Sequence, residues 1–124
     1  MLAAAALDEV AALGIVRTRA NALIELARAW PDLQTRLSAP GDPQALIDAL
    51  TALPGIGDWT AHYIAMRASG WPDAFPPNDV AVLKAMRQRF GPLTPRAAVA
   101  RAEAWRPWRA YAVLRLWNSL TPTP

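Results

Sequence analysis

The stretch LIDALTALPGIGDWTAHYIAM, residues 46–66, decides the fold. Its first part has apolar residues at the spacing of one buried helix face, and that run ends at Leu53–Gly57, where proline and two glycines gather. The pair Asp42-Pro43 supplies an N-cap and a favoured first-turn proline, so we expect a helix over about 43–52. A second helix is expected over 58–69. The sequence therefore predicts two helices joined by a tight turn.

The turn between these helices can bind an anion. Gly55 and Gly57 permit positive φ and leave backbone N–H groups unobstructed, with Ile56 between them as an anchor in the core. These N–H groups lie at the start of the second helix, where the helix dipole favours negative charge. A phosphate could dock there on backbone alone, without any reading of base sequence. The alternative is an ordinary helix–helix turn in which glycine serves geometry only.

The rest of the chain also reads as helices separated by proline and glycine, with no strand-like alternation of any length. We therefore predict an all-α fold, a compact bundle of short helices in a single domain over residues 1–124. The further helices expected are Leu2–Leu13, Arg17–Trp30 with Pro31 ending it, a turn over Leu33–Ser38, Asp79–Phe90 capped by Asn78, Thr94–Trp105, and Arg106–Asn118.

Composition limits the possible chemistry. The 124 residues are 53% hydrophobic, enough for one core. There is no cysteine, which excludes disulfides, thiolate metal sites and a cysteine nucleophile. His62 is the single histidine, so zinc sites built on several histidines are excluded. No apolar run approaches the roughly 18 residues of a membrane span, and a soluble intracellular protein is the default expectation.

Charge is divided unevenly along the chain. Residues 1–79 carry a net charge of −4, and residues 80–124 carry +7. Twelve of the thirteen basic residues are arginine, the side chain suited to bidentate phosphate contact. This pattern favours an anionic partner, with nucleic acid first. The alternative is that arginine simply replaces lysine in a GC-rich genome.

The string LPGIGDWTA, Leu53–Ala61, resembles the helix-hairpin-helix of a superfamily of DNA glycosylases. The resemblance is closest to the 3-methyladenine DNA glycosylases II (AlkA type). It begins partway into their catalytic domain, so the N-terminal part of that fold is expected to be missing and the chain to be a fragment or a truncated form. Further matching stretches are Leu13–Gly14 with Arg19–Ile24, Phe75–Asp79 with Leu83–Lys84, and Ala104–Ala112.

The resemblance implies a catalytic role for Asp79. In this family the aspartate stabilises positive charge on the deoxyribose as the N-glycosidic bond breaks, and it can orient or deprotonate the attacking water. Trp59 stands where bifunctional members carry a lysine, so a monofunctional hydrolase is implied. Taken from the residues alone, Asn78 and Asp79 are simply helix caps.

The resemblance also implies a base pocket, a DNA-backbone surface and a cation site. Trp59, Tyr63 and Trp117 would stack on a flipped, electron-poor alkylated purine, with core packing as the alternative. Val80 replaces a pocket tyrosine, which leaves the accepted bases open. No cofactor is required, and the lack of cysteine excludes the iron–sulfur cluster of some members. The expected backbone-binding residues are Gly55, Gly57, Asp58, Thr60, Arg106 and Arg109, and main-chain carbonyls of Thr51, Leu53 and Ile56 would hold K⁺ or Na⁺.

The partner expected from this resemblance is double-stranded DNA containing alkylated bases, in a bacterial cytoplasm and associated with the nucleoid. Apolar surface left by missing N-terminal helices predicts oligomers. Two other functions stay open. The chain could be a catalytically incomplete, sequence-independent DNA-binding module, or an interaction domain that uses tryptophan and arginine at a protein interface.

Overall fold

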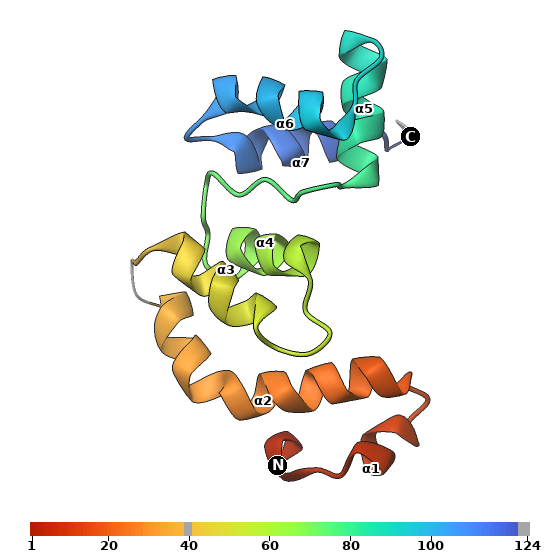
Figure 1. Ribbon diagram of the computed structural model, residues 1–124, viewed down its shortest axis with the longest axis vertical. Helices are drawn as coiled ribbons and strands as arrows, with labels where there is room; N and C mark the ends of the chain where they lie inside the picture. Colours follow the sequence, from red (N-terminus) through yellow and green to blue (C-terminus); the bar gives the residue numbers. More distant parts are fainter. Residues whose placement is uncertain (39–40, 122–124) are drawn as a thin grey trace. The chain divides into compact units, whose positions relative to one another are not determined.

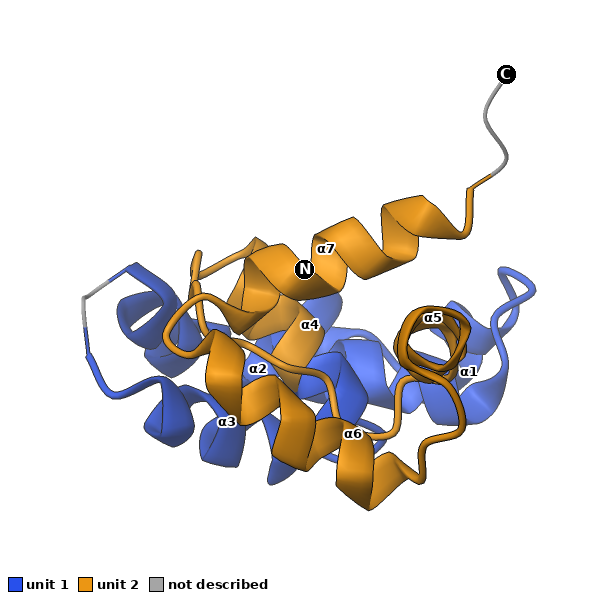
Figure 2. Ribbon diagram, turned by 90° about the horizontal axis from the view of Figure 1, so that it is seen from above, with its two compact units in different colours: residues 1–61 blue, residues 62–124 orange. Residues whose placement is uncertain are grey.

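The computed structural model describes residues 1–38 and 41–121 of the chain. These residues form α-helices and two short 3₁₀ helices and no strand, which confirms the all-α prediction (Figure 1). The chain divides into two compact units, residues 1–61 and 62–124, where the sequence analysis expected a single domain (Figure 2). The boundary between the units falls within α4 (Asp58–Arg67).

The first unit is built around a long helix. Helix α2 (Arg17–Ser38) packs against the 3₁₀ helix η1 (Leu2–Ala4), α1 (Leu7–Ala11) and α3 (Pro43–Thr51). The single helix expected over Leu2–Leu13 is wrong, because Ala5 and Ala6 are extended and Glu9 caps α1 by accepting a hydrogen bond from the Ala6 N–H at 3.0 Å. The buried apolar side chains of this unit come from α1, α2, α3 and the first part of α4: Val10, Ala20, Ile24, Leu33, Leu46, Ile47, Leu50 and Ala61.

The prediction that Pro31 ends its helix is also wrong. Pro31 lies inside α2, which continues to Ser38 and bends in its second half (Figure 1). A mid-helix proline removes one hydrogen bond and costs about 3 kcal/mol. Packing offsets that cost, because Leu33 beyond the proline is 2% exposed, while Arg36 pairs with Asp32 at 2.9 Å on the outer face. Burial on the far side of the proline therefore overrides the local stop signal.

The second unit packs the remaining helices around one core. Helix α5 (Val80–Phe90) contacts both α6 (Pro95–Ala102) and α7 (Arg109–Ser119), and a 3₁₀ turn, η2 (Glu103–Trp105), joins the last two. Helix α6 begins at Pro95, and Thr94 caps it by accepting from the Ala97 N–H at 3.1 Å. The last helix begins at Arg109 rather than at Arg106, because Arg106 is extended. The core of the second unit includes Met66, Phe75, Val82, Met86, Val113 and Leu116.

Among the described residues, no helix is both long enough and apolar enough to cross a membrane.

Candidate functional site

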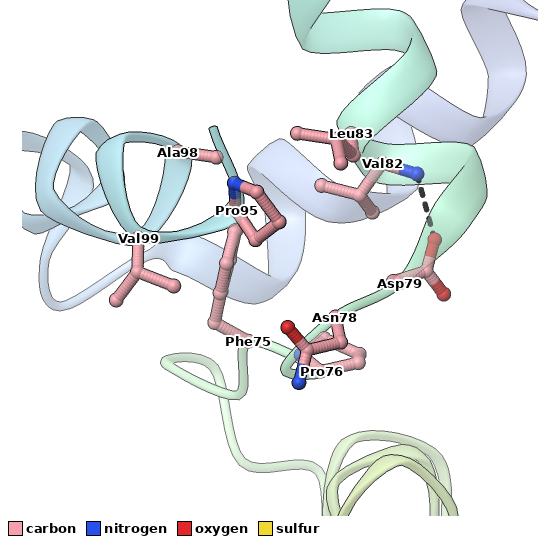
Figure 3. Close-up of a pocket in the computed structure, with 9 residues that line it drawn as sticks. All are labelled: Phe75, Pro76, Asn78, Asp79, Val82, Leu83, Pro95, Ala98 and Val99. Atoms are coloured by element: carbon pink, nitrogen blue, oxygen red, sulfur yellow. Dashed lines mark hydrogen bonds between the residues drawn. The ribbon is translucent and has the colours of Figure 1, made fainter. Parts of the chain in front are cut away.

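Asp79 is the N-cap of helix α5. Its Oδ1 accepts hydrogen bonds from the Val82 backbone N–H at 2.6 Å and from Nε1 of Trp117 at 3.2 Å, and the residue is 8% exposed (Figure 3). The sequence analysis assigned the cap to Asn78, which is wrong. Asn78 is exposed with φ of 55°, one residue before the helix, whereas the extended backbone of Asp79 lets its carboxylate reach the first free N–H groups. A carboxylate at this place also meets the positive end of the helix dipole.

The segment that delivers Asp79, residues 71–79, is fixed by packing rather than by secondary structure. The Trp71 N–H donates to the Ala65 carbonyl at 3.0 Å, and the Pro72 carbonyl accepts from the Ala110 N–H at 2.9 Å. Its middle residues are buried. Beside Asp79 lies a cavity of about 20 Å³, which has room for one water and none for a base (Figure 3). The cavity is lined by Phe75, Pro76, Asn78, Asp79, Val82, Leu83, Pro95, Ala98 and Val99.

Two of the three expected pocket aromatics, Tyr63 and Trp117, lie together, and Trp117 contacts Asp79. The ring of Trp117, whose Nε1 binds Asp79, has its centroid 6.1 Å from that of Tyr63, with a tilt of 41°. The guanidinium of Arg67 lies 5.8 Å from the Tyr63 ring centroid. Both rings are partly buried. Trp59 lies in the first unit, four residues before Tyr63 along α4, and is 41% exposed.

The expected hairpin is present at the predicted place. Helices α3 and α4 flank a turn in which the Leu53 N–H donates to the Leu50 carbonyl at 3.1 Å and the Ile56 N–H to the Leu53 carbonyl at 3.3 Å. Of the two glycines, Gly55 has positive φ, 78°, and Gly57 does not. Gly55 also packs on α2, since an added Cβ would lie 3.0 Å from the Ala22 Cβ.

Gly57 differs from Gly55 in both respects. Its φ lies outside the left-handed region, and a Cβ built on it would meet nothing within 4 Å. The fold therefore gives no steric reason for glycine at this position. Asp58 and Thr60, the other expected backbone-binding residues of the hairpin, lie in the first turn of α4, with Asp58 exposed and Thr60 half-buried.

The three carbonyls expected to hold a monovalent cation lie around the same turn. Within the described turn, the backbone hydrogen bonds engage the Leu50 and Leu53 carbonyls, and none of them ends on the carbonyls of Thr51 or Ile56. Main-chain carbonyl oxygens are the ligands that K⁺ accepts in place of water. The donor set thus fits such an ion. In the described ranges, no group of three or more histidine or acidic side chains is placed to hold a metal.

A cluster of ion pairs joins the loop to the start of α7. The Asp73 carboxylate accepts from Nε and Nη2 of Arg109 at 2.8 and 3.1 Å, and from Nη1 of Arg106 at 2.6 Å. Nε of Arg106 also donates to Glu103 at 2.7 Å. Both arginines that were expected to contact phosphates are therefore engaged by carboxylates of this chain. Arg106 keeps a half-exposed side chain, whereas Arg109 is 7% exposed.

The environment of Asp73 acts on its pKa in two directions. Burial raises the pKa, but hydrogen bonds and charge from Arg109, with the charge of Arg106, outweigh it and hold the pKa of Asp73 below its ordinary value. The sequence analysis did not single out Asp73, because its partner lies 36 residues away and no local spacing pairs them. The sequence offered one signal for such a partner. Arg106 and Arg109 lie on either side of Pro107, and Glu103 is the one acidic residue near them.

Comparison with known proteins shows which proteins this chain resembles. No family model matches the chain. The chain is 41% identical over 116 residues to DNA-3-methyladenine glycosylase 2 of Escherichia coli (strain K12), covering 94% of this chain and 40% of that protein. It is 39% identical over 108 residues to a probable bifunctional transcriptional activator/DNA repair enzyme AlkA of Mycobacterium tuberculosis, covering 87% and 22%. The chain thus spans less than half the length of these curated relatives.

A solved structure has the same fold. The crystal structure of a DNA-3-methyladenine glycosidase from Bacillus halodurans matches with a TM-score of 0.80, at 21% identity, over 95% of this chain and 57% of that one.

Proposed function

We propose that this chain, which is homologous over most of its length to the AlkA-type DNA-3-methyladenine glycosylases, is the hairpin and catalytic part of a monofunctional alkylbase DNA glycosylase. The observation that carries the proposal is the arrangement of Asp79 with Trp117 and Tyr63. A simple DNA-binding hairpin has no need of a fixed, largely buried carboxylate bound to a tryptophan whose ring lies 6.1 Å from that of a tyrosine.

In the proposed reaction Asp79 acts by charge. The Val82 N–H and Trp117 Nε1 both donate to its Oδ1, so the carboxylate is held in place before substrate arrives. As the N-glycosidic bond breaks, positive charge develops on the deoxyribose, and a fixed anion stabilises it. Water is the nucleophile in this proposal. Lys84 is the only lysine of the chain and lies outside the hairpin, so the hairpin has no amine that could form a Schiff base with the sugar.

Tyr63 and Trp117 give the proposed substrate class. An alkylated purine is cationic, and aromatic faces attract cations by roughly 0.5–2 kcal/mol. The two ring centroids lie 6.1 Å apart, and a flipped base would stack against this pair of rings. This supports alkylated purines as substrates.

The hairpin is the proposed contact with the DNA backbone. The open space at Gly57 would let a phosphate approach the N–H groups at the start of α4. Carbonyls of Thr51, Leu53 and Ile56 would hold K⁺ or Na⁺ there, and such an ion supplies positive charge that a phosphate can share.

Base release from methylated duplex DNA tests the proposal. The full chain and Asp79→Asn are compared at low salt, and strand nicks are scored before and after hot alkali. Asparagine caps helices as well as aspartate does, so the variant removes charge with little structural change. We expect release from the wild type alone, with nicks only after alkali. Equal release by both proteins, or nicks without alkali, would contradict the assigned mechanism.

One observation favours a second function. The chain spans 40% of the length of the E. coli relative. A part of such a protein could bind DNA without excising bases. In that case neither the wild type nor Asp79→Asn releases base, while both bind duplex DNA with an affinity that falls steeply as the salt concentration rises.

A further inference from the structure

Helix α7 contacts the loop that carries Asp79 at both ends of that loop. At the loop's end, Nε1 of Trp117 donates to the Asp79 carboxylate. Near its beginning, the Ala110 N–H donates to the Pro72 carbonyl, and Arg109 forms its ion pair with Asp73. One rigid helix therefore sets both ends of a segment that has no secondary structure of its own.

Asp73 is held by four hydrogen bonds from two arginines. Its two oxygens accept from Nε, Nη2 and the backbone N–H of Arg109 and from Nη1 of Arg106, at 2.8, 3.1, 3.3 and 2.6 Å. Two parallel bonds from one guanidinium fix orientation as well as distance. Asp73 and Arg109 are each 7% exposed, so neither can move out to water without leaving a buried charge unpaired.

The constraint passes to Asp79 through buried chain. Residues between the two aspartates are packed, with Ala74 at 0% and Phe75 at 7% exposure. The Arg109 guanidinium lies 5.9 Å from the centroid of the Phe75 ring, and Phe75 lines the cavity beside Asp79. A shift of Asp73 would therefore displace the segment that ends in the Asp79 carboxylate.

We propose that Asp73, clamped by Arg109 and Arg106, is the positioning residue that sets where the Asp79 carboxylate lies. The inference rests on the proposed function, since Asp73 itself touches no substrate. Displacement of a catalytic group by about 1 Å can cost on the order of 100-fold in rate. Loss of the clamp is expected to lower the rate of base release while DNA affinity, which the hairpin supplies, stays unchanged.

The test compares Asp73→Asn with a matched control, Glu103→Gln. Glu103 contacts the same arginines from an exposed position, so its loss leaves the Asp73 clamp intact. The first readout is the indole N–H resonance of Trp117, assigned with Trp117→Phe, because this group binds Asp79 directly. We expect Asp73→Asn to shift the resonance and speed its hydrogen exchange, and Glu103→Gln to leave both as in the wild type.

The second readout is single-turnover base release at saturating DNA. We expect a loss of roughly tenfold or more for Asp73→Asn with an unchanged Kd, and no loss for Glu103→Gln. An unchanged Trp117 resonance in folded Asp73→Asn would overturn the inference. If Asp73→Asn fails to fold, Arg109→Lys decides by the same resonance, since it keeps the charge and loses the fork. A wild type that releases no base refutes the proposed function, while the resonance still reports on the clamp.

Discussion

The two hairpin glycines should separate stability from DNA binding. Replacing Gly55 with alanine places a side chain on a residue with φ of 78°, and the new Cβ lies 3.0 Å from the Ala22 Cβ. Replacing Gly57 with alanine adds a methyl group in open space, at a φ that alanine can adopt. The two variants therefore make the same chemical change, two positions apart, in different environments.

The magnitudes follow from these environments. The left-handed conformation costs an L-residue roughly 1–2 kcal/mol, and the close approach to Ala22 in α2 adds to this because both atoms lie next to backbone. Loss of unfolded-state freedom offsets about 0.4–1 kcal/mol for either substitution. We expect Gly55→Ala to be less stable than wild type by about 1–2 kcal/mol. Gly57→Ala should be as stable as wild type, or more stable by about 0.4–1 kcal/mol.

Urea unfolding followed by circular dichroism measures the stabilities, and fluorescence anisotropy with an unmodified duplex at several salt concentrations measures binding. If a phosphate docks against Gly57, the methyl group weakens DNA binding several-fold and lowers the salt slope, although the protein is no less stable. Wild-type affinity in Gly57→Ala would refute the phosphate site. Equal stability of the two variants would refute the account of Gly55.

Three further outcomes are expected. Because the pKa of Asp73 is lowered in the folded state, its ion pair stabilises the protein above the unfolded pKa of about 3.9. This stabilisation is lost as the pH falls through the folded-state pKa. The urea midpoint, measured from pH 7 to pH 2, should therefore fall less steeply in Asp73→Asn than in the wild type. Met86→Ala, at a fully buried position, should cost about 2–5 kcal/mol in urea unfolding, and Trp59→Ala, which is 41% exposed, clearly less. Trp117→Phe keeps a ring beside Tyr63 and removes the donor to Asp79. The loss in the rate of single-turnover base release, converted to a free energy, should therefore exceed the roughly 1 kcal/mol of stability lost with one hydrogen bond.

Local signals placed several helices correctly. The hairpin follows from Asp42-Pro43 and Gly55, and α6 follows from Thr94-Pro95, because caps and turns are decided by neighbouring residues. Pro31 misled for the opposite reason. Whether a helix survives a proline depends on what the residues beyond it bury, and the burial of Leu33 is a tertiary fact that no local pattern contains.

The site divides in the same way. From residues alone Asp79 read as part of a helix cap, and the structure confirms that Asp79 itself is the cap. Its grouping with Tyr63 and Trp117 came from resemblance to a family, since these residues are spread over more than fifty positions. Neither the local sequence pattern nor the family resemblance predicted a role for Asp73. Its ion-pair partner lies 36 residues away, so no local spacing links the two residues, and the resemblance assigned Asp73 no role.

A count of the basic residues in the sequence does not say which groups those residues contact in the structure. The surplus of +7 over residues 80–124 favours an anionic partner, with nucleic acid first, or reflects arginine in place of lysine in a GC-rich genome. In the structure Arg109 is buried against Asp73, Arg106 is shared between Asp73 and Glu103, and the Arg101 guanidinium lies 3.9 Å from the Phe90 ring centroid. Part of the surplus therefore holds the fold together. A phosphate can be bound by the backbone N–H groups around Gly57 without side-chain charge, and the Gly57→Ala variant tests that contact alone.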